Sequence, residues 1–493
     1  MAYNFIPADR NQPYMLPPSL DDWLPEDHPA RFIVDIVKKL DLAPFYVGRR
    51  DDGWGRAAYD PKVIVGVLLY AYSRGVRSSR AIERGLIEDV GLRYIAVNNC
   101  PDHATIARFR KDYGDALAEL FPAVLHLCVR ANIVDASLIA VDGTKIQADA
   151  SPANNLTEED FRKLVRDILD DAERIDQEED RAHGDRRGDE LPDHLVDEKH
   201  RLEWIERELE EIKKSKEPWR KSAPRVNSTD PDSRVLKVRG GYLQGYNAQA
   251  VVDRNQVILA ADVFKLAADA PLFEPMITTA CDNLQAAGGA PPGTALADAG
   301  YISLDNATLD AGCNLLIAPS NPKNIAKIKL DLDERQSAYE ARIDEIERIA
   351  DRRVEVMEDL VAKRIVLREA ADRLGMSVPG VWAMKKRYQS VGRKGVQPKA
   401  PPPPELSAKE IMAAKLLTEE AKKTYALRSV MVEPVFGQIK WDRAMRRFHR
   451  RGIAACRVEW MLEATVHNLL KLWRSGWSGG AASSELVTPC VAA

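Results

Sequence analysis

The 493-residue sequence predicts an α/β fold, α+β overall, in which a mixed sheet follows an all-helical segment. Two observations carry this prediction. Residues 1–135 space their apolar side chains as helices do, whereas the period shortens abruptly at residues 137–141. Thereafter short apolar runs come first as a hairpin and then alternate with a helical stretch, which is the order of elements in an α/β domain.

The first 135 residues are expected to form helices. Val63, Val67 and Tyr70 recur at helical spacing, in a stretch apolar enough to be buried. Ser78 and Ser79 suit the start of a further helix, because serine side chains accept hydrogen bonds from the first free backbone amides. We therefore predict an N-terminal helical domain over residues 1–135.

The predicted strands are short apolar runs bounded by turn residues. The first, residues 137–141, is followed by Asp142, Gly143 and Thr144, which indicates a strand that ends in a turn. The other predicted elements are strands at 245–253 and 257–264 joined by a tight turn at 254–255, a helix at 271–284, and strands at 294–297 and 314–319. We expect this core domain to span residues 136–330 and 405–478.

A first charged insertion interrupts the core at residues 156–217. From Glu158 to Glu217 it has 23 Asp and Glu against 13 Lys and Arg. Two apolar stripes separated by helix-breaking residues predict a helical hairpin. The stripes are Phe161, Leu164, Ile168, Ile175 and Leu202, Ile205, Leu209, Ile212, and the breakers are Gly184, Gly188 and Pro192.

A second insertion covers residues 331–404. It is expected to be a long helix, a compact helical pair and an extended proline linker at 401–404. Ala371, Gly375 and Val381 have helix-turn-helix spacing, and Ser377 would cap the second helix. A plain helical hairpin would show the same spacing.

The second helix of this pair is predicted to contact DNA. Residues 383–399 contain six Lys and Arg and no acid. We expect Lys385, Lys386 and Arg387 to be exposed and to bind phosphates, while Val378, Val381 and Trp382 pack on the other face.

The composition narrows the class of protein. No uninterrupted apolar stretch is long enough for a membrane span, the N-terminus lacks the pattern of a secretory signal, and six scattered cysteines offer no zinc ribbon. A cytoplasmic protein is therefore expected. The net charge of −4 hides a basic stretch, Thr424 to Val458, with eight Lys and Arg against two acids.

Three carboxylates are candidates for metal-binding, catalytic residues. Asp142 and Asp298 each follow a short buried strand, and strand ends at one edge of an α/β sheet are where ligand-binding groups collect. Glu433 is expected to open an amphipathic helix with Pro434 in its first turn. The simpler readings are that each Asp forms a turn and that the Glu complements the helix dipole.

The order of several motifs resembles a bacterial insertion-sequence transposase of the DDE class, with a ribonuclease-H-like core. The resemblance covers roughly residues 3–325 and 405–475. Its motifs are YDP at 59–61, SSRAIE at 78–83, PDH at 101–103, VDGTK at 141–145, GYNAQ at 245–249, ADAGY at 297–301, YALRSVMVEPVFGQIK at 425–440 and FHRRG at 448–452. The 425–440 stretch resembles the Tyr-Arg-Glu-Lys signature of such enzymes, although four residues, in place of the usual three, separate the arginine from the glutamate.

This resemblance implies a function for each motif residue. Asp142, Asp298 and Glu433 would be the catalytic residues and would bind two Mg2+ or Mn2+ ions, with Asp142 bridging both. Arg428 and Lys440 would contact DNA phosphates, and Tyr425 would hydrogen-bond or stack there. We expect further phosphate contacts from the basic stretch, since a purely solvated helix face is the less favoured interpretation of its arginines: Arg446, Arg447, Arg450 and Arg451.

The predicted function is cut-and-paste transposition. The enzyme would hydrolyse phosphodiester bonds at insertion-sequence ends and transfer strands into target DNA. It would act on double-stranded DNA, without a membrane, as a homodimer or higher oligomer. The alternatives are a ribonuclease-H-like nuclease that does not join strands, and a catalytically silent DNA-binding protein.

Overall fold

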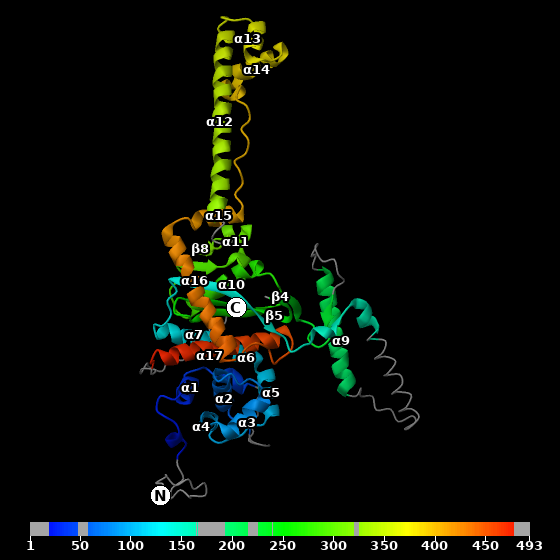
Figure 1. The fold of residues 1–493 in the computed structure, drawn as a ribbon, viewed down its shortest axis with the longest axis vertical. Coiled ribbons are helices and arrows are strands. Elements are labelled where there is room, and N and C mark those ends of the chain that lie inside the picture. The colour runs from blue at the N-terminus through cyan, green and yellow to red at the C-terminus, as the bar shows by residue number, and fades with distance from the viewer. Residues whose placement is uncertain are drawn as a thin grey trace, which may run out of the picture. The chain divides into compact units, whose positions relative to one another are not determined.

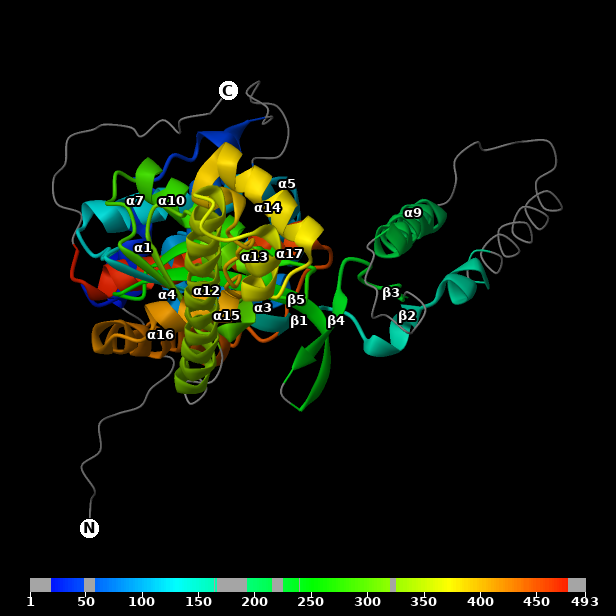
Figure 2. The same ribbon diagram turned by 90° about the horizontal axis from the view of Figure 1, so that it is seen from above.

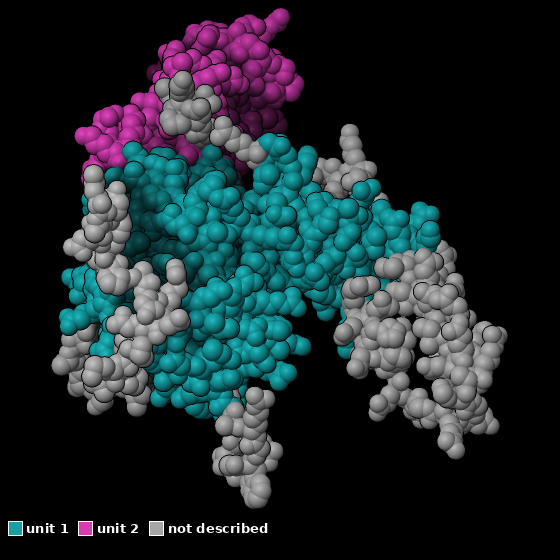
Figure 3. Space-filling model, turned by 60° about the horizontal axis from the view of Figure 1, so that its bottom comes forward, with its two compact units in different colours: residues 1–301, 309–315, 424–493 teal, residues 302–308, 316–423 magenta. Residues whose placement is uncertain are grey.

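The protein is represented by a computed structural model that describes residues 19–47, 58–163, 165, 193–214, 225–238, 240–319 and 325–477. The chain divides into two compact units (Figure 3). Unit 1 comprises residues 1–301, 309–315 and 424–493, and unit 2 comprises residues 302–308 and 316–423. Each unit is treated by itself below.

Unit 1 begins with helices, as the sequence predicts. They are α1 (Pro29–Val37), α2 (Pro61–Ser73), α3 (Ser79–Glu88), α4 (Val90–Ile95), α5 (His103–Asp112), α6 (Gly114–Ala118) and α7 (Leu120–Arg130). The predicted apolar helix is α2, which is buried along most of its length and begins after the capping side chain of Asp60. Its neighbour in space is α17 (Ile453–Arg474), against which α2, α6 and α7 all pack. The N-terminal helices therefore share a core with the C-terminal helix.

The sheet is mixed, which confirms the predicted fold class. Its strands are β1 (Leu138–Gln147), β4 (Arg234–Val238), β5 (Gly241–Asp253), β6 (Ile258–Phe264), β7 (Thr294–Ala297) and β8 (Asn314–Ile317). The order is β4-β5-β1-β7-β8, with β6 also paired to β5. Strand β5 is antiparallel to both β1 and β6, whereas β7 is parallel to β1. Helices α10 (Phe273–Ala286) and α17 cover the strands, above and below them in Figure 1.

One predicted turn is wrong. Asp142, Gly143 and Thr144 do not end the first strand but lie in the middle of β1. The reason is the long partner strand β5, which pairs with β1 continuously and places Asp142 opposite Ala250 and Gly143 opposite Gln249. A turn-forming dipeptide therefore stays extended, because the neighbouring strand satisfies its backbone.

The predicted hairpin between β5 and β6 is present with a longer connection. Strand β5 ends at Asp253 and β6 begins at Ile258. The Asp253 carboxylate accepts a hydrogen bond from the Val257 amide at 2.7 Å, and Gln256 adopts a positive φ of 65°. The connection thus spans four residues between strands, twice the predicted two.

The first insertion is seen in part. Helix α9 (Asp193–Lys214) lies beside the two-stranded pair β2 (Asn155–Leu156) and β3 (Val226–Asn227), as Figure 2 shows. The predicted stripe of α9 packs with Phe161 and Val226 in one apolar cluster. The predicted positions Leu164, Ile168, Ile175, Gly184, Gly188 and Pro192 lie outside the residues whose side chains are described.

Unit 2 is built on the predicted long helix, α12 (Ile325–Val361). Its other helices are α11 (Leu304–Thr308), α13 (Leu367–Leu374), α14 (Val378–Val391) and α15 (Ala408–Lys415). Helices α13 and α14 pack on the C-terminal part of α12 around Met357 and Val381. The proline linker has no regular structure and is tied to α12 by hydrogen bonds from Tyr339 to the Pro401 carbonyl and from Arg335 to the Glu405 carbonyl.

The helical pair has the predicted turn. Gly375 ends α13 with a φ of 63°, and the Ser377 side chain caps α14 by accepting from the Gly380 amide. The predicted packing face is only partly correct, because Val381 is buried whereas Trp382 is 50% exposed. Trp382 instead carries the Lys386 ammonium over its ring, 3.8 Å from the centroid.

Candidate active site

Asp142 and Asp298 come together at adjacent parallel strands. Asp142 lies in β1, and Asp298 directly follows β7, as predicted. A single guanidinium joins them: Nη2 of Arg428 is 3.0 Å from Asp142 Oδ2 and 3.5 Å from Asp298 Oδ2. We call Asp142 and Asp298 the acid pair. The long-range pairing shows that residues far apart in sequence converge on one point.

Backbone amides fix the orientation of both carboxylates. The Gly143 amide donates to Asp142 Oδ1, and the Gly300 amide donates to Asp298 Oδ1, each at 2.8 Å. Burial raises the pKa of Asp142 to about 6, with Asp298 adding to the effect and Arg428 opposing it. Asp142 therefore holds its proton more readily than a solvated aspartate does.

Helix α16 (Glu419–Gly437) and the π-helical turn that follows it (Gln438–Asp442) supply the cations. Besides Arg428, they place Tyr425 and Lys440 at the site. Burial raises the pKa of Tyr425, and the charges of Asp298 and Asp142 raise it further, while Arg428 lowers it. Burial lowers the pKa of Lys440, with Asp142 opposing, and the Lys440 ammonium donates to the Lys145 carbonyl at 3.2 Å. Three of the four signature residues thus face the acid pair.

The fourth signature residue, Glu433, does not join them. It is exposed, and five residues after Arg428 it lies about 140° around the helix axis at 3.6 residues per turn. Among the described residues, no group of three or more His, Cys, Asp and Glu side chains is arranged to hold a metal ion. The extra residue between Arg428 and Glu433 therefore has a structural consequence, since a spacing of four would leave the two side chains on one face.

The predicted helix start at Glu433 is also wrong, because α16 begins at Glu419 and contains Pro434 in its interior. A proline there cannot donate to the carbonyl four residues earlier, that of Val430. The Gln256 side chain replaces the missing donor, with Nε2 at 2.9 Å from the Val430 oxygen. A contact from the β5–β6 connection thus allows the helix to continue through Pro434.

The arginines of the basic stretch are divided between intramolecular partners and solvent. Arg447 and Arg451 both pair with Asp149, and their side chains remain about half exposed. Arg446 stacks on the exposed ring of Trp441, 3.7 Å from its centroid. The buried Nη1 atom of Arg450 has no hydrogen-bond partner among the described residues. The two ion pairs with Asp149 therefore offset part of the positive charge that these arginines contribute.

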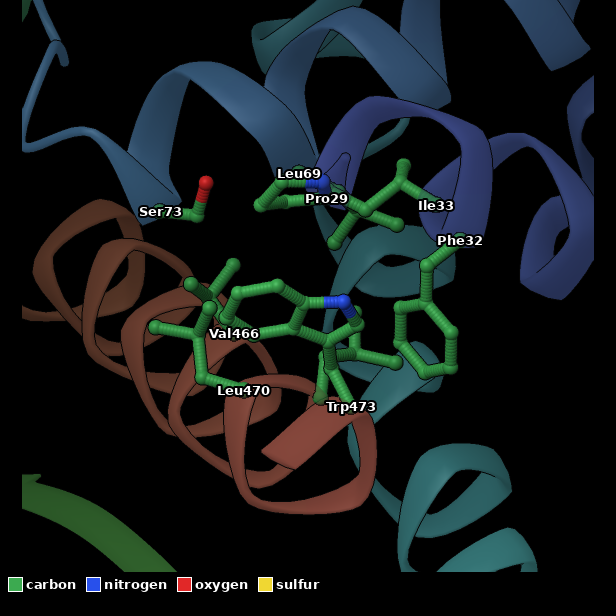
Figure 4. A pocket seen from close by; sticks show the side chains of 9 residues that line it. Pro29, Phe32, Ile33, Leu69, Ser73, Val466, Leu470 and Trp473 are labelled. Atoms are coloured by element: carbon green, nitrogen blue, oxygen red, sulfur yellow. The ribbon is translucent and has the colours of Figure 1, made fainter. Parts of the chain in front are cut away.

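One apolar pocket lies away from this chemistry. Figure 4 shows it between the N-terminal helices and α17, where its lining offers no carboxylate. The lining residues are Pro29, Phe32, Ile33, Leu69, Ser73, Val466, Leu469, Leu470 and Trp473. In the described part of the chain, no helix has the length and apolarity needed to span a bilayer.

Two parts of the chain match known transposase families. Residues 18–112 match a family described as a transposase domain (DUF772), and residues 400–473 match a family described as a transposase DDE domain. These two matches support an insertion-sequence DDE transposase. No curated protein and no solved structure gave a significant match. The second match contains α16 and α17, and hence Arg428, Glu433 and Lys440, while the first contains α1 to α5.

The two matches support part of the predicted function. A DDE transposase domain implies an enzyme that cleaves and transfers nucleic acid, and transposase families act on DNA. Neither the nuclease nor the silent DNA-binding alternative receives support from the comparisons.

The sequence did not single out Asp269, whose carboxylate also lies at the site. Asp269 belongs to no predicted strand end and to none of the motifs.

Proposed function

We propose that the transposase cuts the phosphodiester bonds at the ends of its insertion sequence and joins the freed strands to target DNA. The observation that carries this proposal is the acid pair, in which Asp142 and Asp298 share one guanidinium. Two carboxylates this close repel each other unless a cation lies between them. Such a pair is suited to bind a divalent cation when DNA is present.

The donor set fits Mg2+ or Mn2+. Both groups are hard oxygen ligands, and Mg2+ is usually held by one or two carboxylates together with substrate phosphates. When bound, two such ions would activate a water or 3′-hydroxyl and stabilise the leaving oxygen. Asp142 and Asp298 would hold them, and Glu433 is proposed as the third carboxylate from its position in the DDE-domain match.

Helix α16 and the π-helical turn after it carry side chains suited to bind the scissile region of the DNA. The Arg428 guanidinium contacts both carboxylates through Nη2, and a guanidinium can bind further oxygens, such as those of a phosphate, through its other N–H groups. Lys440 and Tyr425 lie beside the same carboxylates. We propose that these three side chains orient the DNA backbone over the acid pair.

Strand joining tests this function directly. The substrate is a supercoiled plasmid that carries the DNA flanking the gene on both sides, incubated with the protein and Mg2+ or with a chelator. We expect metal-dependent cuts at the ends followed by products joined to a second plasmid. Cuts without joined products would favour a nuclease, and binding without cuts would favour a silent DNA-binding protein. Light scattering of the DNA complex would show whether a dimer or larger assembly forms.

We further propose that α13 and α14 contact DNA. Lys386 and Arg387 are exposed on α14, next to the exposed Trp382. Lys385 differs from the prediction, because it is half-buried and donates to the Leu360 carbonyl near the end of α12. Of the three predicted cations, Lys386 and Arg387 are therefore the better candidates for phosphate contacts.

Charge reversal at these two positions tests the proposal. Lys386→Glu with Arg387→Glu should weaken binding of end DNA by about tenfold or more. Each lost phosphate contact reduces the number of counterions that DNA releases when the protein binds. The matched control is Arg342→Glu with Arg348→Glu, which reverses two exposed charges on α12. Equal affinity of the two double variants would assign α13 and α14 a role other than DNA contact.

A further inference from the structure

Asp269 lies beside the acid pair and collects several hydrogen bonds. It belongs to the connection between β6 and α10, directly before a short helical turn. Its Oδ1 atom accepts from Asn247 Nδ2 at 2.7 Å, and from Gln249 Nε2 and Lys145 Nζ at 3.0 Å. Hydrogen bonds to an ionised oxygen are about twice as strong as neutral ones. The Asp269 carboxylate is therefore held firmly in one orientation.

The three donors come from two paired strands. Asn247 lies opposite Lys145, and Gln249 lies opposite Gly143, the residue after Asp142. A Cβ at Gly143 would overlap the Gln249 amide, so the glycine leaves the space that Gln249 occupies on its way to the carboxylate. Asp269 thus fastens the strand that carries Asp142 to its antiparallel neighbour.

The same network reaches Asp298. The Tyr301 hydroxyl donates to the Gln249 side-chain oxygen, and Tyr301 is fully buried in the turn that follows Asp298. Gly300 belongs to the same turn. A Cβ built there would lie 3.0 Å from Asp298 Oδ1 and 3.4 Å from Asp269 Oδ2. Both carboxylates therefore lie against one short piece of backbone.

We propose that Asp269 is a positioning residue of the transposase, which aligns Asp142 and Asp298 and helps them to bind the divalent cation. The inference rests on the proposed function. Asp269 acts in two ways: its hydrogen bonds fix strands β1 and β5 and the turn after β7, and its negative charge balances Lys145 beside the acid pair. A residue that only fastened its own loop would affect folding but not cation binding.

Mn2+ titration of the full-length protein, followed by electron paramagnetic resonance, tests this role without relying on activity. In Asp269→Asn we expect about tenfold weaker Mn2+ binding, the size typical for loss of a group that supports metal ligands. The Mn2+ concentration needed for half-maximal DNA cleavage should rise by the same factor. The matched control is Asp282→Asn, which neutralises an exposed carboxylate on α10.

A second variant keeps the test decisive if Asp269→Asn does not fold. Lys145→Met removes one donor and one positive charge but keeps the carboxylate, so Mn2+ binding should become several-fold tighter. Unchanged Mn2+ affinity in folded Asp269→Asn, or no tightening in Lys145→Met, would overturn the inference. Wild-type protein that neither binds Mn2+ nor joins strands would instead overturn the proposed function.

Discussion

Unit 1 contains two clusters of arginine and carboxylate side chains. They differ in the ratio of arginines to carboxylates and in how exposed the carboxylates are. At the candidate active site one arginine, Arg428, lies against Asp142 and Asp298, whose side chains retain 18% and 45% exposure. In the second cluster two arginines lie against one glutamate that has no exposure at all. The first cluster has a surplus of negative charge within reach of solvent, and the second has a surplus of positive charge sealed from it.

The second cluster joins three distant parts of the chain. Arg77 comes from the connection between α2 and α3, Arg443 follows the π-helical turn, and Glu463 lies in α17. Arg443 also contacts His467, one turn further along α17. Because a buried ion pair cannot exchange its partners for water, these contacts hold the N-terminal helices to α17. Exposure thus separates a carboxylate pair that solvent can reach from a buried ion cluster that fixes the fold.

The largest expected effect is at the acid pair. Asp142→Asn should reduce DNA cleavage by about a thousandfold or more, because the cation loses a charged ligand. DNA binding should remain within about threefold of wild type, since the phosphate contacts are retained. Cleavage and gel-shift assays measure the two quantities. Asp282→Asn, an exposed carboxylate on α10, is the control, and equal losses in both variants would contradict the assignment.

Substitution in the buried cluster of Arg77, Arg443 and Glu463 should instead lower the stability of the fold. Glu463→Gln is expected to lower the free energy of unfolding by about 3–5 kcal/mol, because it leaves two buried arginines without their carboxylate. Asp298→Asn, in the exposed cluster, should change it by only about 0–1 kcal/mol. Denaturant unfolding followed by circular dichroism compares them. The distinction between the clusters fails if both substitutions destabilise equally.

A smaller effect is expected from Lys440. Lys440→Ala should flatten the log–log salt dependence of DNA binding by about one unit, as for one lost phosphate contact. Mn2+ binding should be retained. Lys237→Ala, which removes an exposed charge on β4, provides the control. An unchanged slope would mean that Lys440 serves only the hydrogen bond to the Lys145 carbonyl.

The smallest effect concerns pH. Burial and the Arg443 charge lower the pKa of His467 to about 3, from an ordinary value of about 6.5 for histidine. Below pH 6.5 the unfolded chain therefore takes up a proton that the folded chain does not, and stability falls as pH decreases. The slope from this group is about 1.4 kcal/mol per pH unit. His467→Asn should remove it between pH 6.5 and 5, and unfolding curves with an unchanged slope would contradict this.

Several elements could be predicted because their signals are local. The helices of residues 1–135, the strands at 245–253 and 294–297, and the turn at Gly375 follow from apolar period, capping residues and glycine, which act over a few positions. The position of Asp298 at a strand end followed in the same way. The turn at Asp142 failed because pairing with β5, over a hundred residues away, extended the strand.

By itself, the sequence determined the order of elements, the fold class and, through its ordered motifs, the transposase family. Tertiary structure alone decided which charged groups meet. It placed Arg428 between Asp142 and Asp298, left Glu433 exposed on α16, and brought Asp269 to the site. The physical reason is that side-chain contacts between distant positions depend on strand register and helix phase, which packing of the whole chain sets.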